Sequence, residues 1–186
     1  MTSEADRQLL LLLARGALTA RVTGQTMPSP GSSDVLARLS GAFVSLHKRG
    51  QLRGCIGHIE ADEPLARVVA RCAVAASNAD PRFAPVAPDE LPHIVIELSI
   101  LGPLEPIATS VDIEIGRHGL VVEQGWNRGL LLPQVATEWK WDRDTFIAET
   151  CRKAGLPPDA WTKSATLCRF EAEVFGESEQ GLGARG

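Results

Sequence analysis

Residues 41–57, GAFVSLHKRGQLRGCIG, predict a β-hairpin. Gly41–His47 has the composition of a strand, and the polar segment Lys48–Gln51 supplies a turn that contains a glycine. Leu52–Gly57 then lies on the return strand, or at the point where that strand leaves the sheet. Because the two strands of a hairpin are antiparallel, this stretch favours an antiparallel sheet.

The rest of the chain adds further strands, with helices at irregular intervals. Apolar residues at helical spacing follow Pro64, whereas His93–Leu101 alternates between two faces as a strand does. Prolines predict a loop over Asp80–Phe83 and Pro85–Pro92. Asp34–Leu39, after a Pro/Gly/Ser loop at Pro28–Ser33, is predicted to be a short turn or strand. Ser3 followed by Asp6 can cap a helix that runs through Leu9 to about Arg21. The remaining predictions are a helix at Asp142–Ala154 and strands at Val111–Ile115, Leu120–Glu123, Gly129–Leu132 and Cys168–Phe175. We therefore expect an α+β fold with a mainly antiparallel sheet and flanking helices.

The length and composition limit the classes of protein to which the chain can belong. At 186 residues the chain fits one domain, which we place at residues 1–177, with a disordered C-terminal tail at 178–186. The formal net charge of -4 gives no electrostatic reason to expect nucleic acid or an anionic membrane as a partner. No apolar run approaches the roughly 20 residues of a membrane span, and acidic residues near the start oppose a signal peptide. We therefore expect a soluble, cytoplasmic protein with reduced thiols.

Cys55 is the cysteine that packing does not explain. It lies in a predicted loop between Gly54 and Gly57, two residues after Arg53. Positive charge and backbone amides favour the reactive thiolate, and glycines let a ligand approach the main chain. The alternative is a tight bend, with Cys55 as a small buried residue and Arg53 paired with a surface acid. The other three cysteines share apolar faces and are predicted to be buried: Cys72, Cys151 and Cys168.

Proton handling is assigned to His58 or Glu97. His58 lies three residues after Cys55 and pairs with it only if the chain curls. Glu97 interrupts an apolar strand, so its carboxylate needs a partner, and an arginine is the alternative to a catalytic role. A metal site on Cys55 and His58 would need further ligands such as Glu97 and His118. Because no ligand spacing supports such a site, we predict no metal and no cofactor.

Four further side chains are candidates for binding a ligand. Arg82 and Arg128 stand next to Pro81 and Gly129, a placement that suits recognition of a carboxylate or phosphate, or only a surface charge. His118 is predicted in a turn, as a ligand contact or a solvated residue. Gln134 lines a pocket or covers the start of a helix. The remaining histidines, His47 and His93, are predicted at strand ends without a catalytic role.

Five segments occur in an order that resembles the AMMECR domain family, over roughly residues 5–177. They are Leu52–Gly57, Asp80–Phe83, Ile96–Leu101, Arg128–Val135 and Cys151–Pro157. His58, where many relatives carry threonine, is similar to the subgroup called AmmeMemoRadiSam system protein A. The resemblance implies one AMMECR-type domain of two unequal lobes, with the Arg-Gly-Cys segment near a cleft between them. It also implies association with a Memo-family protein and a radical S-adenosylmethionine enzyme.

The function expected from these observations is that of a small-molecule-handling protein or accessory enzyme acting with those partners. Cys55 would be the nucleophile or redox thiol, and Arg53 and Arg82 would bind an anionic group of an unknown small molecule. Glu97 or His58 would handle protons. The alternative is a non-catalytic adaptor that grips a partner protein. Nucleic-acid binding ranks below both, because the chain is acidic.

Overall fold

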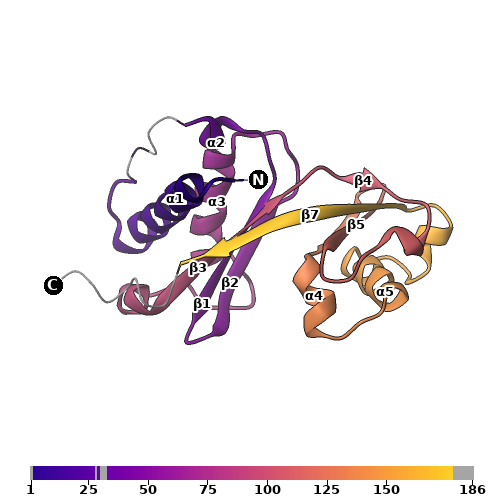
Figure 1. The fold of residues 1–186 in the computed structure, drawn as a ribbon. Helices are drawn as coiled ribbons and strands as arrows, with labels where there is room; N and C mark the ends of the chain where they lie inside the picture. Colours follow the sequence, from indigo (N-terminus) through magenta and orange to yellow (C-terminus); the bar gives the residue numbers. More distant parts are fainter. Residues whose placement is uncertain (1, 28, 30–32, 178–186) are drawn as a thin grey trace. The chain divides into compact units, whose positions relative to one another are not determined.

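The computed structural model describes residues 2–27, 29 and 33–177, and it divides into two compact units (Figure 1). The first unit comprises Met1–Ile100 and Glu173–Gly186, and the second comprises Leu101–Ala172. Two units of unequal size agree with the predicted unequal lobes, and the cleft stays a prediction. The predicted disordered tail, residues 178–186, and most of the predicted loop Pro28–Ser33 lie outside the described residues.

The first unit is a three-stranded antiparallel sheet covered by helices. Its strand order is β2-β1-β3, and the end of β7 lies beside β3, where the Glu177 N–H donates to the Ile96 carbonyl at 2.9 Å. The elements are α1 (Glu4–Thr23), α2 (Asp34–Ala37), β1 (Ala42–Lys48), β2 (Gln51–His58), α3 (Leu65–Asn78), the 3-10 helix η1 (Pro88–His93) and β3 (Ile94–Leu101).

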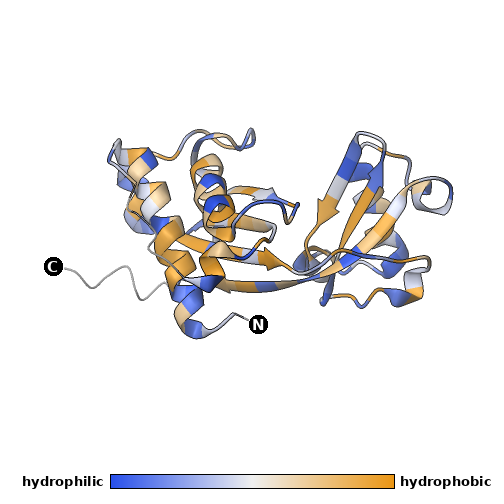
Figure 2. Cartoon of the chain, turned by 90° about the horizontal axis from the view of Figure 1, so that it is seen from above, coloured by the Kyte–Doolittle hydropathy of each residue, from blue (hydrophilic) through white to orange (hydrophobic). Residues whose placement is uncertain are grey.

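The core of the first unit lies between α3 and one face of this sheet. The apolar stripe predicted after Pro64 packs against β1 and β2, and α1 packs on α3. Figure 2 shows hydrophobic residues along the strands and mixed colouring on the helices, as amphipathic helices require. Helix α1 begins where the Ser3 hydroxyl accepts the Asp6 N–H at 3.2 Å, and it ends at Gly24, whose φ is +71°.

The second unit pairs β7 with β5, and β5 with β6, all antiparallel, with β4 added to β7. Helix α5 packs on β5 and β6 over a core that includes Phe146 and Ile147, both fully buried. The elements are β4 (Glu105–Pro106), the 3-10 helix η2 (Ser110–Asp112), β5 (His118–Gln124), β6 (Asn127–Leu131), α4 (Pro133–Glu138), α5 (Arg143–Lys153), the 3-10 helix η3 (Ala160–Thr162) and β7 (Thr166–Gly176).

The predicted α+β class with a mainly antiparallel sheet is confirmed, and several local predictions are wrong. Asp34–Leu39 contains the short helix α2, and the loop at residues 81–92 ends in η1, whose first residue is a proline that suits a helix start. The predicted strand Val111–Ile115 is largely replaced by η2, where the Thr109 hydroxyl accepts the Val111 N–H at 3.4 Å. No helix in the described part of the chain is long and apolar enough to cross a membrane.

Candidate functional site

A one-residue β-bulge decides which face of the sheet carries Cys55. The Cα partners across β1 and β2 are Ser45–Cys55, Leu46–Gly54 and His47–Leu52. Arg53 is therefore an extra residue on β2, and it shifts the register by one. If β2 continued the register of the turn without a bulge, Cys55 would pair with Val44, which is fully buried on the α3 side. The bulge thus turns the Cys55 side chain to the opposite face. Cys55 lies within β2, so the predicted return strand holds at this position and the predicted loop does not.

Three side chains then form a row across β2, β1 and β3. Cys55 lies opposite Ser45, and Ser45 lies opposite Glu97, so all three share one face. We call these three residues the polar row. The Ser45 hydroxyl donates to the Cys55 sulfur at 3.3 Å, and Ser45 is buried. The polar row therefore joins a thiol, a hydroxyl and a carboxylate that are far apart in sequence.

Glu97 differs from the expectation that an arginine would neutralise it. Its side chain is partly buried. Within residues 2–27, 29 and 33–177 it takes part in no ion pair with an arginine, lysine or histidine. The proton-handling role of Glu97 stays a prediction.

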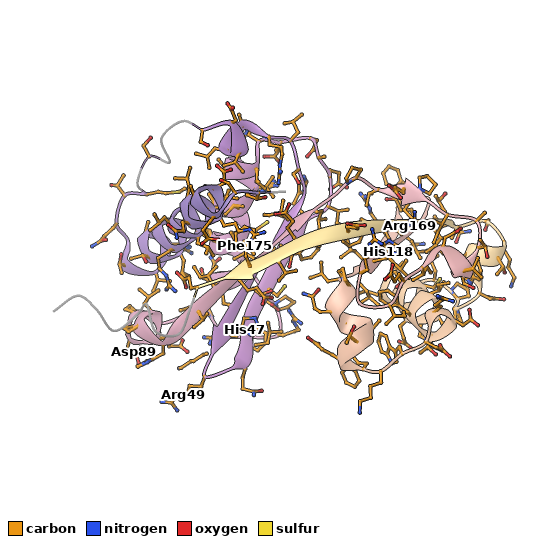
Figure 3. The ribbon with its side chains drawn as sticks, in the orientation of Figure 1. His47, Arg49, Asp89, His118, Arg169 and Phe175 are labelled. Carbon is orange, nitrogen blue, oxygen red and sulfur yellow. The ribbon has the colours of Figure 1, made fainter. Side chains whose placement is uncertain are left out.

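His47, labelled in Figure 3, is on β1. It follows Ser45 by two residues and therefore shares the face of the polar row. Its Nε2 atom is buried and has no hydrogen-bond partner in the described part of the chain. The sequence placed His47 at a strand end and gave it no role. The structure puts it beside the row, where a bound group would satisfy this nitrogen.

Asp80 fixes the main chain at Cys55. Its carboxylate accepts the Cys55 N–H at 2.9 Å and two guanidinium N–H groups of Arg82, at 2.9 and 2.7 Å. Asp80 is buried, and the hydrogen bonds from Arg82 hold the pKa of its carboxyl well below the ordinary value. The carboxylate therefore occupies the outer edge of β2 as a strand partner would. The Arg82 guanidinium, which was predicted to bind an anionic ligand, pairs with Asp80. The Arg82 side chain is nevertheless half exposed.

Arg53 pairs with an acidic side chain, as the alternative interpretation, a tight bend without a reactive thiol, predicted. Its guanidinium donates to both carboxylate oxygens of Glu90, at 3.1 and 2.9 Å, and to the Ala84 carbonyl at 2.9 Å. Lys48 donates to the same carboxylate at 2.8 Å. The hydrogen bonds from Arg53, and then Lys48, lower the pKa of Glu90 to about 2. This network ties the proline-rich segment to β2 at the bulge.

His58 is not brought to Cys55. The two residues are three apart on β2, so their side chains leave on opposite faces. The His58 Nε2 lies 2.7 Å from the Asp62 Oδ1, and a hydrogen bond with His58 lowers the pKa of Asp62. Possible ligand atoms of His58, Asp62 and Glu63 lie within 4.8 Å of one another. Two arginines compete for Glu63, Arg67 at 3.3 Å and Arg71 at 3.0 Å.

The two glycines beside Cys55 serve close packing. A Cβ on Gly54 would lie 2.2 Å from the Ala76 carbonyl oxygen on α3. A Cβ on Gly57 would lie 2.2 Å from the Phe43 ring on the other face. Neither glycine has a positive φ. Their predicted role in ligand approach stays a prediction, and each already has a structural reason to be glycine.

The other predicted ligand residues belong to the second unit. His118 begins β5 and is buried, not in a turn, and its Nδ1 accepts the Glu114 N–H at 2.9 Å. Burial, and then the nearby arginines, lower the pKa of His118. Arg128 forms an ion pair with Glu123 at 2.6 Å, and Gln134 lies in the first turn of α4.

A shallow cavity of about 440 Å³ in the second unit contains none of the predicted site residues. It is lined by Ser110, Glu114, Ile115, Asp142, Arg143 and Asp144. Asp142 caps α5 by accepting the Thr145 N–H at 2.8 Å, and Arg143 donates to the Ile113 carbonyl at 2.6 Å. Asp142 and Arg143 therefore already have structural partners.

Sequence reasoning missed Ser45, His47, Asp80 and Glu90. Alternation along β1 already placed Ser45 and His47 on one face, but the facing residue on β2 depends on the bulge. Asp80 and Glu90 act across 25 and 37 residues of chain, and no local pattern marks such partners.

Comparison with known proteins agrees with the fold and with the motifs. A family model described as AMMECR1 matches residues 11–175. A protein of Methanothermobacter thermautotrophicus is 44% identical, over 94% of this chain and 96% of its own length. Protein Mbar_A1807 of Methanosarcina barkeri is 41% identical, over 96% and 94%. The crystal structure of the uncharacterised protein PH0010 from Pyrococcus horikoshii has a TM-score of 0.84 at 40% identity, covering 91% of this chain and 90% of that one. The chain therefore belongs to the AMMECR1 family.

Proposed function

We propose that the polar row is a small-molecule site at which Cys55 is the reacting group. The observation that supports this most directly is the thiol that receives a hydrogen bond from Ser45 at 3.3 Å, in line with a carboxylate that has no ion pair in the described chain. A thiol that only fills space needs neither neighbour. The proposal includes the family association, in which this protein acts with a Memo-family protein and a radical S-adenosylmethionine enzyme.

The residues divide the chemistry between them. A hydroxyl that donates to sulfur favours the thiolate, which is the nucleophilic form. Addition of the S–H group across a carbonyl would join the sulfur to carbon and deliver one proton to oxygen, so no external oxidant or reductant is needed. The Cα atoms of Cys55 and Glu97 are two strand spacings apart, roughly 10 Å, so Glu97 acts on the bound molecule and not on the thiol directly.

The test compares metabolites in cells that hold the radical enzyme and the Memo-family protein together with this protein. The variants are the native chain, Cys55→Ser and, as a matched control, Cys168→Ala, which removes a buried thiol of the second unit. We expect Cys55→Ser to change the metabolite profile as strongly as deletion of the whole protein does. Cys168→Ala should leave the profile native. A native profile for Cys55→Ser, with normal thermal stability, would overturn the proposal.

A second candidate function, that of a non-catalytic adaptor, is favoured by two exposed tryptophans of the second unit. Trp126 is fully exposed, and Trp139 is exposed over about two thirds of its surface. Exposed large aromatic side chains are typical anchors of protein interfaces. The adaptor function predicts that Trp126→Ala and Trp139→Ala abolish co-purification with the Memo-family protein. Under it, Cys55→Ser and the exposed control Val111→Ala should leave the complex intact.

A further inference from the structure

We infer that the polar row takes a ligand with a positively charged amino group, which pairs with Glu97 while the reactive atom of the ligand faces Cys55. This inference rests on the proposed function, because it assumes that Cys55 is the reacting group. It adds the class of ligand, a small amino compound. It also assigns Glu97 a role in choosing that ligand.

The first argument is the contrast between Glu97 and three other carboxylates of the same unit, of which Asp80 is buried and Glu90 and Glu177 are partly buried. Asp80 is paired with Arg82, Glu90 with Arg53, and Glu177 with Arg15. Glu97 is partly buried too, yet it makes no such pair with any residue in the described chain. A partly buried carboxylate attracts a cation more strongly than a fully solvated one does, so an incoming ammonium group would pair favourably with it.

The second argument concerns the space beside Glu97. Its neighbour at the end of β7 is Gly176, where an added Cβ would lie 3.6 Å from the Glu97 Cβ. On the other side lies Ser45, a small residue. Neither neighbour covers the carboxylate with a long side chain or supplies a charge. A small cationic group therefore has room next to Glu97 on these two sides.

The third argument is the histidine in the adjacent row. The His47 Nε2 is buried and lacks a hydrogen-bond partner in the described residues, and His47 is on the face that carries Glu97. A buried polar atom of this kind is normally satisfied by protein, water or ligand. A ligand that reaches from Cys55 toward Glu97 would pass this nitrogen and could bond to it.

The ligand is short. Cys55 and Glu97 are separated by one strand, so their Cα atoms are roughly 10 Å apart, and both side chains extend toward the bound molecule. An amino compound with a reactive carbon a few bonds from its nitrogen would span the remaining distance.

The test measures the rates at which three methanethiosulfonates modify Cys55. The methyl reagent is neutral, the 2-aminoethyl reagent carries a positive charge, and the 2-sulfonatoethyl reagent carries a negative charge. In each case the thiolate sulfur bonds to the reagent sulfur and methanesulfinate leaves, so the reaction is balanced. Rates at Cys55 are read by peptide mass spectrometry and divided by those of 2-mercaptoethanol. High salt screens the long-range field of the acidic chain.

In the native protein we expect a normalised ratio of cationic to anionic rate that is about tenfold higher than in Glu97→Gln, which corresponds to about 1.4 kcal/mol of pairing. The control Glu138→Gln removes an exposed carboxylate of the second unit and should keep the native ratio. Equal ratios in the native protein and in Glu97→Gln, with Cys55 still labelled, would overturn the amino-compound inference alone. Failure of the neutral reagent to label Cys55 would instead overturn the proposed function and, with it, the inference.

Discussion

The two faces of the sheet β2-β1-β3 are built from alternate residues of the same strands and have different properties. One face meets α3 and presents fully buried aliphatic side chains such as Val44, Leu46 and Ile96. The other face presents the polar row. Because adjacent residues point to opposite faces, one residue of register decides which role a side chain takes. The bulge at Arg53 makes this choice for Cys55.

The largest effect on this comparison should come from Gly54→Ala, on the α3 face. The new Cβ would lie 2.2 Å from the Ala76 carbonyl oxygen, and a helix backbone cannot move aside as a side chain can. We expect the free energy of unfolding, measured by urea denaturation, to fall by about 3 kcal/mol.

The matched control is Gly57→Ala on the opposite face. There the Cβ meets the ring of Phe43, which is only partly buried and can rotate away. The loss should be about 1 kcal/mol. Equal losses at the two glycines would contradict the difference between the faces.

A smaller effect is expected from Glu90→Ala, which releases the bulge. This change leaves the Arg53 guanidinium partly buried without its carboxylate, so stability at neutral pH should fall by about 2 kcal/mol. The exposed neighbour Asp89 provides the control, and Asp89→Ala should cost less than about 0.5 kcal/mol. Both losses of stability are to be measured by urea denaturation.

The contribution of Glu90 should also depend on pH. The pKa of Glu90 is lowered in the folded protein from its ordinary value of 4.5 to about 2. A lowered carboxyl pKa stabilises the fold fully above the ordinary value, and this stabilisation is lost as the pH falls toward the folded value. The stability difference between native protein and Glu90→Ala should therefore shrink between about pH 4.5 and pH 2. A difference that stays constant over that range would refute the role given to the carboxylate.

The smallest effect on stability is expected from Ser45→Ala, which changes only the chemistry of the face that carries the polar row. Loss of one hydrogen bond to sulfur should lower stability by about 0.5 kcal/mol. The rate at which iodoacetamide modifies Cys55 at neutral pH should fall about threefold, because the thiolate loses a donor. Ser99→Ala removes a buried serine on the same face that lies opposite Phe43 and not Cys55, so it should leave the rate unchanged. An equal rate in Ser45→Ala and native protein would show that the hydroxyl does not act on the thiol.

Much of the fold followed from local patterns. The alternation of His93–Leu101 correctly put Ile94 and Ile96 on a core face and Glu97 on the other. Burial of Cys72, Cys151 and Cys168 followed from their apolar neighbours and is confirmed. His118 was misjudged because the glycines around it indicate a turn, whereas pairing with Glu171 draws it into β5.

The sequence by itself determined the hairpin, the apolar stripe of α3, the α+β class and the family, because each of these depends on residue spacing along a short stretch of chain. Only the tertiary structure decided that Cys55 shares a face with Ser45 and Glu97, that Asp80 holds its main chain, and that Arg53 is anchored by Glu90. The physical reason is that the register of a strand determines which alternate side chains are buried on each face of the sheet. Here the register is set by a single bulged residue, which a carboxylate 37 residues away holds in place, and this leaves no periodic signal in the sequence.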